Sequence, residues 1–311
     1  MQNEKTLEEL LNERATLAAR LSQLPYQGTT EIKHKDNNRY VYVRKRVAGK
    51  LTSRYVGPYS EELYEVVLRS THEAQELNKR IKHIERDLFE LGYVEKDLPA
   101  QIVKNLDYAR ANMKLSIYDQ AILEGVATSF PQTEAIIDNG VVYGVSATDV
   151  QKVLNLKHAW EFILDKDIIQ SPASLGILQR IASLVNEGFL TRGGEIRSLP
   201  VRIGGTEYIP PIPHESDVVD KLGCLTAQKG PAIALAIELC LYIMRSQLFL
   251  DGNKRAAILF ANFYLIQRGA GLLVVPERLV GDFKDLLIEY YETGDPGSIS
   301  MFLNQNCYSK L

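Results

Sequence analysis

A regular apolar repeat between residues 67 and 91 restricts the folds open to this chain more than any other feature. Its members are Val67, Ala74, Leu77, Ile81, Ile84, Leu88 and Leu91. Spacings of three and four place all of them on one face of a helix, in the pattern of a coiled-coil seam. Ser60, followed by two glutamates, is typical of the start of such a helix. A long helix with this seam needs a second helix to bury it.

The first residues of the chain provide a candidate partner helix. Thr6 and Glu9 have capping-box spacing, and leucines recur at helical intervals up to Leu24, before Pro25 ends the pattern. We therefore predict an antiparallel helical hairpin with coiled-coil packing, and we also allow for a homo-oligomer.

The segment RYVYVRKRVAGKLTSRYVG, residues 39–57, predicts a β-hairpin between the two helices, with its tip at Gly49. The hairpin and its approach are basic, through Lys33, Lys35, Arg39, Arg44, Lys45, Arg46, Lys50 and Arg54 against Glu31 and Asp36. The charge is compatible with contact to nucleic acid or an acidic partner through Arg39 to Arg54. Alternatively, a thin two-stranded ribbon has to be polar, and these charges are simply solvated.

The composition excludes an intrinsically disordered, collagen-like or mucin-like chain. With 45% hydrophobic and 24% charged residues the 311-residue chain is of ordinary globular type, and its net charge of −3 gives no overall attraction to nucleic acid or to anionic membranes. Three cysteines without metal-ligand spacing favour a reducing compartment. The most apolar stretch, 232–244, is short and contains Glu238, so we expect no membrane span and a cytoplasmic location.

Helical patterns dominate after residue 97, and we place a domain boundary near residues 93–97, giving an N-terminal module of 1–93 and a helical domain of 94–311. One stretch breaks the helical pattern. Short strand-like runs flank Gly204-Gly205 and predict a second β-hairpin at Ile196 to Ile209. Pro210, Pro211 and Pro213 follow it and place this hairpin on a surface.

The segment from Leu248 to Ala257 carries the strongest chemical signal. Its Asp251-Gly252-Asn253 loop leads into an apolar helix. Backbone N–H groups and the positive end of the helix dipole then lie in one place, which favours a phosphate group. The alternative is that Asp-Gly-Asn is only a turn and a helix cap.

This segment resembles the signature of the Fic (filamentation induced by cAMP) and Doc (death on curing) family, His-x-Phe-x-Asp/Glu-Gly-Asn-Gly/Lys-Arg, which stands here as residues 247–255. Gln120 to Gly125 is similar to the family's inhibitory helix motif, and Val141 to Leu164 to the helices that follow it. The segment 193–213 is similar to the flap that docks target proteins. The resemblance covers residues 100–305 in the family's order.

The resemblance implies an all-α Fic fold, a helical bundle with a β-hairpin flap, and transfer of AMP from ATP to a hydroxyl of a target protein with Mg²⁺. In that scheme Asp251 binds the metal, Gly252, Asn253 and Lys254 hold phosphate, and Arg255 stabilises the leaving pyrophosphate. Glu124 takes the regulatory position. The flap residues are Val201, Ile203, Gly204 and Tyr208.

Three positions depart from the family's pattern. Gln247 replaces the histidine that acts as catalytic base, and an amide cannot take up a proton near neutral pH, so we expect weak or absent transfer. Lys254 matches the Doc-like form of the motif, for which the alternative is transfer of phosphate. Ile258 replaces a second arginine, which leaves Glu124 without its family partner. A further alternative is a non-catalytic nucleotide sensor or scaffold.

Overall fold

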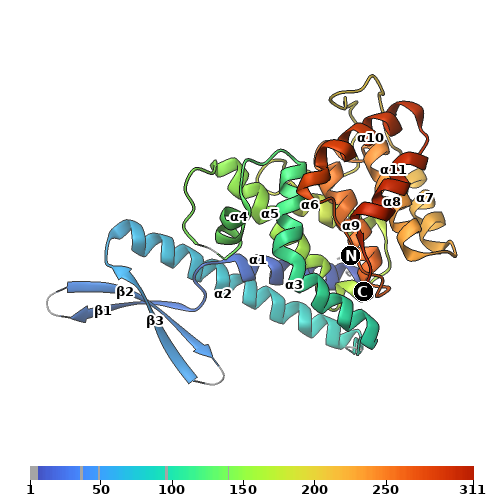
Figure 1. Ribbon diagram of the computed structural model, residues 1–311. Helices are drawn as coiled ribbons and strands as arrows, with labels where there is room; N and C mark the ends of the chain where they lie inside the picture. Colours follow the sequence, from blue (N-terminus) through green and yellow to red (C-terminus); the bar gives the residue numbers. More distant parts are fainter. Residues whose placement is uncertain (1–5, 36–37, 48–49, 95–96, 139) are drawn as a thin grey trace. The chain divides into compact units, whose positions relative to one another are not determined.

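The computed structural model describes residues 6–35, 38–47, 50–94, 97–138 and 140–311. It separates into two compact units, Met1–Glu95 and Lys96–Leu311. Figure 1 shows the first unit in blue to blue-green and the helices of the second from green to red.

Two antiparallel helices, α1 (Leu7–Gln23) and α2 (Glu61–Glu90), pack together in the first unit. The predicted capping box is present: Glu9 N–H donates to Thr6 Oγ1 at 3.2 Å and Thr6 N–H donates to Glu9 Oε2 at 2.7 Å. The buried residues of the seam are Leu10, Leu11, Leu17, Leu77, Ile84 and Leu88. The helical hairpin predicted from the leucine spacing is therefore confirmed.

A three-stranded antiparallel sheet lies between these helices in the sequence, in the order β1 (Thr29–Lys35), β2 (Asn38–Val47) and β3 (Lys50–Pro58). The predicted hairpin corresponds to β2 and β3, and its tip at Gly49 lies outside the described residues. Strand β1 is not predicted by the sequence pattern. Apart from Ile32 this strand has no strongly apolar side chain, so its alternation is a weak signal.

One face of the sheet packs against α2. Val41 and Val43 of β2 and Val67 of α2 are buried there. On the same side Thr30 Oγ1 of β1 and Thr71 Oγ1 of α2 lie 2.8 Å apart and share a hydrogen bond. The helix supplies the support that a small sheet needs, since an isolated hairpin is at best marginally stable in water.

The second unit is a bundle of helices. It comprises α3 (Ala100–Leu123), α4 (Phe130–Ile137), α5 (Ala147–Ile163), η1 (Ile168–Gln170), α6 (Leu175–Val185), α7 (Glu215–Ala227), α8 (Ala232–Ser246), α9 (Asn253–Ile266), η2 (Glu277–Leu279), α10 (Val280–Thr293), α11 (Gly297–Phe302) and the π-helical turn η3 (Leu303–Cys307). Every residue of α9 except Lys254 is buried, and α9 contacts α3, α5, α6 and α8. The two short strands β4 (Leu272–Leu273) and β5 (Tyr308–Ser309) pair near the end of the chain. The unit is mostly helical, as predicted, with α9 at its centre.

The flap differs from the prediction. Residues 191–213 contain turns and extended backbone but no strand, so the expected β-hairpin at Ile196 to Ile209 is wrong. A turn does lie at Gly204-Gly205, and Gly205 has a φ of 85°, which glycine adopts without strain. Pro200 lies within the first expected strand and Pro210 directly follows the second, and neither has the N–H group that strand pairing requires, so the flap is a loop.

Candidate functional site

The candidate site is built on the loop that connects α8 to α9. α8 ends at Ser246 and is followed by Gln247, whose backbone is left-handed with φ 44° and ψ 63°. Gly252, with φ 76°, then precedes the first residue of α9, and no side chain caps this helix N-terminus. The two left-handed residues turn the chain sharply, and the amides of the first helical turn are left available to a ligand.

Asn253 fixes the shape of this loop. Its Oδ1 accepts from Phe249 N–H at 2.9 Å, and its Nδ2 donates to Phe249 O at 2.8 Å and to Gln247 Oε1 at 3.1 Å. The side chain is buried, and both of its amide hydrogens are engaged. Asn253, predicted to hold phosphate, therefore holds the loop through its side chain and can offer a ligand its backbone N–H.

Gln247 is held in a similar way. Besides accepting from Asn253, its side chain donates from Nε2 to Met244 O at 2.6 Å. The amide thus bonds to the last turn of α8 and to the first residue of α9. The position where the Fic motif has histidine serves here as a structural link between two helices.

Asn186, at the end of α6, supports the loop from the other side. Its Nδ2 donates to Asp251 O at 2.9 Å and to Gly193 O at 3.1 Å. A Cβ at position 252 would lie 2.9 Å from Asn186 Oδ1, so only glycine fits between this side chain and the loop.

A cluster of charges lies at the N-terminus of α9. Arg255 is buried; its Nε lies 3.5 Å from Glu124 Oε2, its Nη2 lies 3.3 Å from Asp251 Oδ2, and its Nη1 donates to Val185 O at 2.8 Å. Lys254 Nζ lies 3.7 Å from Glu124 Oε1. Glu124, which the sequence leaves without its family partner, is therefore paired with the two cationic residues of the loop.

Glu124, Asp251 and Lys254 of this cluster line a pocket of about 360 Å³, whereas Arg255 lies behind its lining. Its charged lining consists of Glu124, Arg202, Asp251, Lys254 and Lys284, and its other lining residues include Gly204, Gln247, Gly252, Asn253, Leu287 and Tyr291. Burial raises the pKa of the Tyr291 phenol, which keeps it protonated near neutral pH. Three cations and two carboxylates thus converge on one small space.

The flap borders this pocket, and buried contacts fix its base. Arg202, Ile203 and Gly204 line the pocket opposite the loop. Arg197, which is 2% exposed, donates from its guanidinium to Leu199 O at 2.7 Å, to Pro211 O at 2.6 Å and to Gln247 O. One arginine therefore joins both ends of the flap to the end of α8.

Two other predicted flap residues lie away from the pocket lining. Tyr208 packs under Arg245 of α8, whose guanidinium carbon is 4.2 Å from the ring centroid, and it lines a neighbouring pocket of about 540 Å³ that also includes His214. Val201 is half-buried and lines neither of these pockets. Of the predicted docking residues, only Ile203 and Gly204 lie at the charged site.

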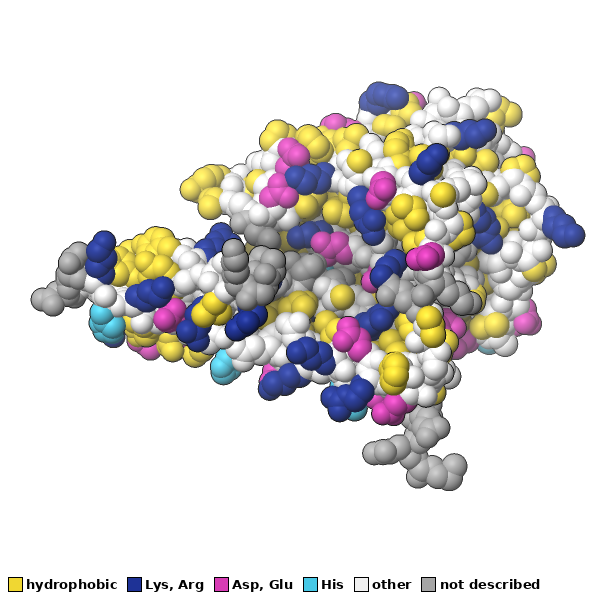
Figure 2. All heavy atoms as spheres, turned by 90° about the horizontal axis from the view of Figure 1, so that it is seen from below, with side chains coloured by type: hydrophobic (Ala, Val, Ile, Leu, Met, Phe, Trp, Pro, Cys, Tyr) yellow, Lys and Arg dark blue, Asp and Glu magenta, His cyan; other side chains and the backbone are white. Residues whose placement is uncertain are grey.

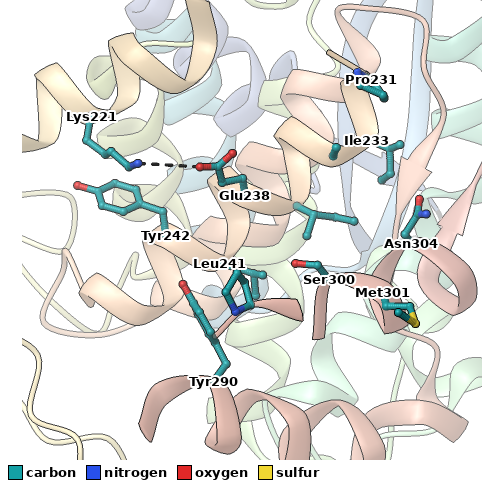
Figure 3. Close-up of a pocket in the computed structure, with 13 residues that line it drawn as sticks. Lys221, Pro231, Ile233, Glu238, Leu241, Tyr242, Tyr290, Ser300, Met301 and Asn304 are labelled. Atoms are coloured by element: carbon teal, nitrogen blue, oxygen red, sulfur yellow. Dashed lines mark ion pairs between the residues drawn. The ribbon is translucent and has the colours of Figure 1, made fainter. Parts of the chain in front are cut away.

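A larger pocket of about 620 Å³ has a different character (Figure 3). Figure 3 shows it between α8, α10 and α11, with Ile233, Leu241 and Met301 among its apolar walls and an ion pair of 3.9 Å from Lys221 Nζ to Glu238 Oε1 at one side. Its two charged lining residues pair with each other. The pocket at the loop, in contrast, holds an excess of cations for an anionic ligand.

Several of these residues could not be recognised from the sequence. Asn186, Arg197, Arg202 and Lys284 reach the site from α6, the flap and α10, far from the loop in the chain. No motif spacing marks them, although Arg202 lies inside the flap segment. The sequence located the loop, and the fold supplies the rest of the pocket.

Comparisons with known proteins bear on both units. Residues 172–265 match the model of the Fic/DOC family. Residues 4–65 match the model of a domain of unknown function, DUF6788. No curated protein matches the chain.

Solved structures share the fold. Fic-1 from C. elegans aligns with a TM-score of 0.52 and 19% identity, over 76% of this chain and 72% of that one. A Fic domain containing signaling protein from Bacteroides thetaiotaomicron aligns with a TM-score of 0.53 and 19% identity, over 67% and 85%. A Fic family protein from Desulfovibrio desulfuricans gives 0.52 and 17%, over 68% and 73%. At these identities the likeness establishes the fold.

Proposed function

The chain belongs to the Fic/DOC family through residues 172–265, and from that premise we propose that the unit Lys96–Leu311 binds a nucleoside triphosphate, ATP above all, together with Mg²⁺. We further propose that Gln247 greatly reduces or abolishes the transfer of AMP to a protein hydroxyl. The observation that carries the proposal is the convergence of Arg202, Lys254 and Lys284 on the N-terminus of α9.

This arrangement suits a polyphosphate. Backbone amides at a helix N-terminus point toward an anion, and the helix dipole adds favourable potential there. Arg202 comes from the flap, Lys254 from α9 and Lys284 from α10, so the positive charge surrounds the pocket from three elements. Arg255 Nε is buried and has no hydrogen-bond partner, so one cationic donor in the first turn of α9 is left unused.

The residues also fit a magnesium ion that is shared with phosphate. Asp251 is exposed, with 67% of its side-chain surface accessible, and can offer one carboxylate oxygen to the ion. Among the described residues no group of three or more His, Cys, Asp or Glu side chains could hold a metal. Mg²⁺ needs no such cage, because it commonly takes one or two carboxylates and completes its shell with water and substrate phosphates. When bound, the ion would neutralise charge on the phosphates.

The residues at the loop are better suited to binding and orienting a nucleotide than to catalysing the transfer of AMP. Arg255 is held in place by Val185 O and pairs with the carboxylates of Glu124 and Asp251, so it fixes the position of these two pocket residues. The described lining of the pocket contains no histidine, and both polar atoms of the Gln247 amide are engaged. A general base typically contributes about 10²–10⁴-fold to a rate, so its loss would leave a nucleotide-binding protein with little transferase activity.

Two further functions rest on specific residues. Lys254 in the pocket lining is consistent with the Doc-like alternative, phosphate transfer instead of AMP transfer. The engaged Gln247 amide favours a nucleotide sensor or scaffold. In each case a protein partner at the flap, beside Ile203 and Gly204, stays a prediction.

The cytoplasmic location also stays a prediction. Cys224, Cys240 and Cys307 are free thiols, which is consistent with a reducing compartment. None of the helices in the described ranges combines the length and the apolar character needed to cross a bilayer.

Calorimetric titration of the full chain with ATP, ADP, GTP and CTP, with and without Mg²⁺, tests the proposal. We expect saturable, Mg²⁺-dependent binding at nucleotide concentrations up to about 1 mM. Asp251→Ala and Lys284→Ala should each weaken it. Lys221→Ala is the matched control, because this lysine lies in the apolar pocket. Absence of saturable heat with all four nucleotides would rule out the phosphate site.

A further inference from the structure

The N-terminal sheet has a second face, and its residues are of a different kind from those that pack on α2. Side chains alternate along β2, so Val41 and Val43 point to the helix while Tyr40, Tyr42 and Arg44 point away from it. Residues paired directly across the strands share a face, which places Glu31 and Lys33 of β1 and Ser53 and Tyr55 of β3 beside them. We call this surface the outer face.

Three tyrosine rings form the centre of the outer face. The Tyr42 and Tyr55 ring centroids lie 5.4 Å apart, and those of Tyr40 and Tyr55 lie 6.1 Å apart. Tyr55 is 50% exposed, although a ring of this size is usually covered in a folded domain. Lys33 Nζ lies 4.5 Å from the Tyr42 ring centroid and donates to Ser53 Oγ at 2.9 Å. The result is an aromatic surface with an ammonium group held against it.

Positive charge surrounds these rings. The outer face carries Lys33, Lys35, Arg44 and Arg46, against Glu31. In Figure 2, Lys and Arg side chains lie around a patch of hydrophobic side chains at the left end, where Figure 1 has the sheet. The chain as a whole has a net charge of −3, so this concentration of cations is a local property of the sheet.

We propose that the outer face of β1–β2–β3 binds single-stranded nucleic acid. Exposed aromatic rings accept unpaired bases by stacking, and neighbouring Lys and Arg side chains follow the phosphates of the same strand. A sheet of three strands is about 10 Å wide between its outer strands, which gives room for two or three stacked bases. This surface is independent of the pocket at the α8–α9 loop.

The rings distinguish this ligand from other anionic partners. A charged surface that serves only for solubility does not need three clustered tyrosines, and duplex DNA hides its base faces inside the helix. An acidic peptide would satisfy the cations but would leave the aromatic faces without a planar partner. Single strands satisfy both features at once.

Fluorescence anisotropy of the full chain tests the proposal. The probes are labelled random-sequence single-stranded DNA and RNA of about 16 nucleotides and the matching duplex, a length near the upper site size of a single-strand-binding domain. We expect saturable binding to the single strands at about 50 mM KCl, weaker binding to the duplex, and a loss of about 20-fold in affinity at about 200 mM KCl if three phosphates are contacted.

Substitutions at Tyr55 separate stacking from charge. Tyr55→Ala should weaken single-strand binding about tenfold, while Tyr55→Phe keeps the ring and should bind as the unmodified chain does. Tyr143→Ala is the matched control, because this tyrosine is 83% exposed in the other unit and should have no effect. Circular dichroism verifies that each variant is folded.

Three results would overturn the proposal. The first is no saturable binding to either single strand at low salt. The second is duplex binding as tight as single-strand binding, or an unchanged affinity of Tyr55→Ala, because either would remove the rings from the explanation. The third is displacement by polyglutamate as effective as displacement by an unlabelled single strand, which would indicate a surface that selects for negative charge alone.

Discussion

The charged side chains of the N-terminal sheet and those of the α8–α9 loop are placed in opposite ways. On the sheet, residues such as Arg44 lie exposed on strands whose other face forms the core. At the loop, Arg255 is buried and faces Glu124 and Asp251. Exposed charges contribute little to stability but remain available to a large partner, whereas buried charges are costly to separate and can hold a small ligand in a defined geometry.

The largest effect expected from this difference concerns stability. Arg255→Ala should lower the free energy of unfolding of the second unit by about 3–5 kcal/mol, because it leaves Glu124 and Val185 O without a buried partner. Arg44→Ala on the sheet should change stability by no more than about 0.5 kcal/mol. Urea unfolding measures both. Fluorescence of Trp160, the single tryptophan of the chain, follows the second unit, and a transition in circular dichroism that Trp160 does not report belongs to the first.

Arg192 provides the control for Arg255 within the same unit. It pairs with Glu195 at 2.6 Å, and its side chain is 75% exposed. Arg192→Ala should therefore behave like Arg44→Ala. If the two exposed arginines proved as costly to remove as Arg255, burial would not be what distinguishes the two regions.

The loop and its helices could be predicted from the sequence because the signals are local. Asp251-Gly252-Asn253 followed by an apolar run predicts a turn and a helix start, and α9 does begin at Asn253. The heptad-like spacing likewise predicts the α1–α2 hairpin. In both cases neighbouring residues determine the structure, so no knowledge of the fold is needed.

The features that the sequence pattern did not predict depend on residues far apart in the chain. Arg202 and Lys284 join the pocket only after the flap and α10 have packed beside the loop. Strand β1 has too few apolar residues for a clear alternation, and it is held by its pairing with β2. The prediction of a β-hairpin in the flap was wrong for another reason. A turn does lie at Gly204-Gly205, but Pro200 and Pro210 prevent the strand pairing that a hairpin needs.

The next largest effect concerns transferase activity at the α8–α9 loop. Gln247→His should raise incorporation of labelled AMP into protein by about 10²-fold, because an imidazole restores a general base at this position. Histidine is among the non-glycine residues more often found at positive φ, so the left-handed backbone at residue 247 can accommodate it.

Gln267→His is the matched control for this experiment. Gln267 ends α9, and its Nε2 donates to Ser171 O at 3.1 Å, away from the pocket lining. This variant should stay as inactive as the unmodified chain. Strong labelling by the unmodified chain that survives Gln247→Ala would show that another residue is the base.

The smallest effects are expected when one glutamate in each region is replaced by glutamine. Glu124→Gln should tighten MgATP binding about fivefold, or by ~1 kcal/mol, because it removes a negative charge that lies 3.5 Å from Arg255 and 3.7 Å from Lys254. Glutamine keeps the size of the side chain, and Arg255 keeps its bond to Val185 O. Glu31→Gln on the outer face, where Lys33 lies 3.8 Å away, should change single-strand affinity by less than about twofold, since solvent and salt screen that pair.

Glu238→Gln in the apolar pocket is the control for the nucleotide titration, because this glutamate also faces a lysine, at 3.9 Å, but lies away from the loop. It should leave MgATP binding unchanged. An affinity that fell in Glu124→Gln would mean that Glu124 positions the cations for phosphate instead of competing with it. The pairing of Glu124 with Lys254 and Arg255 would then prepare the pocket for its ligand.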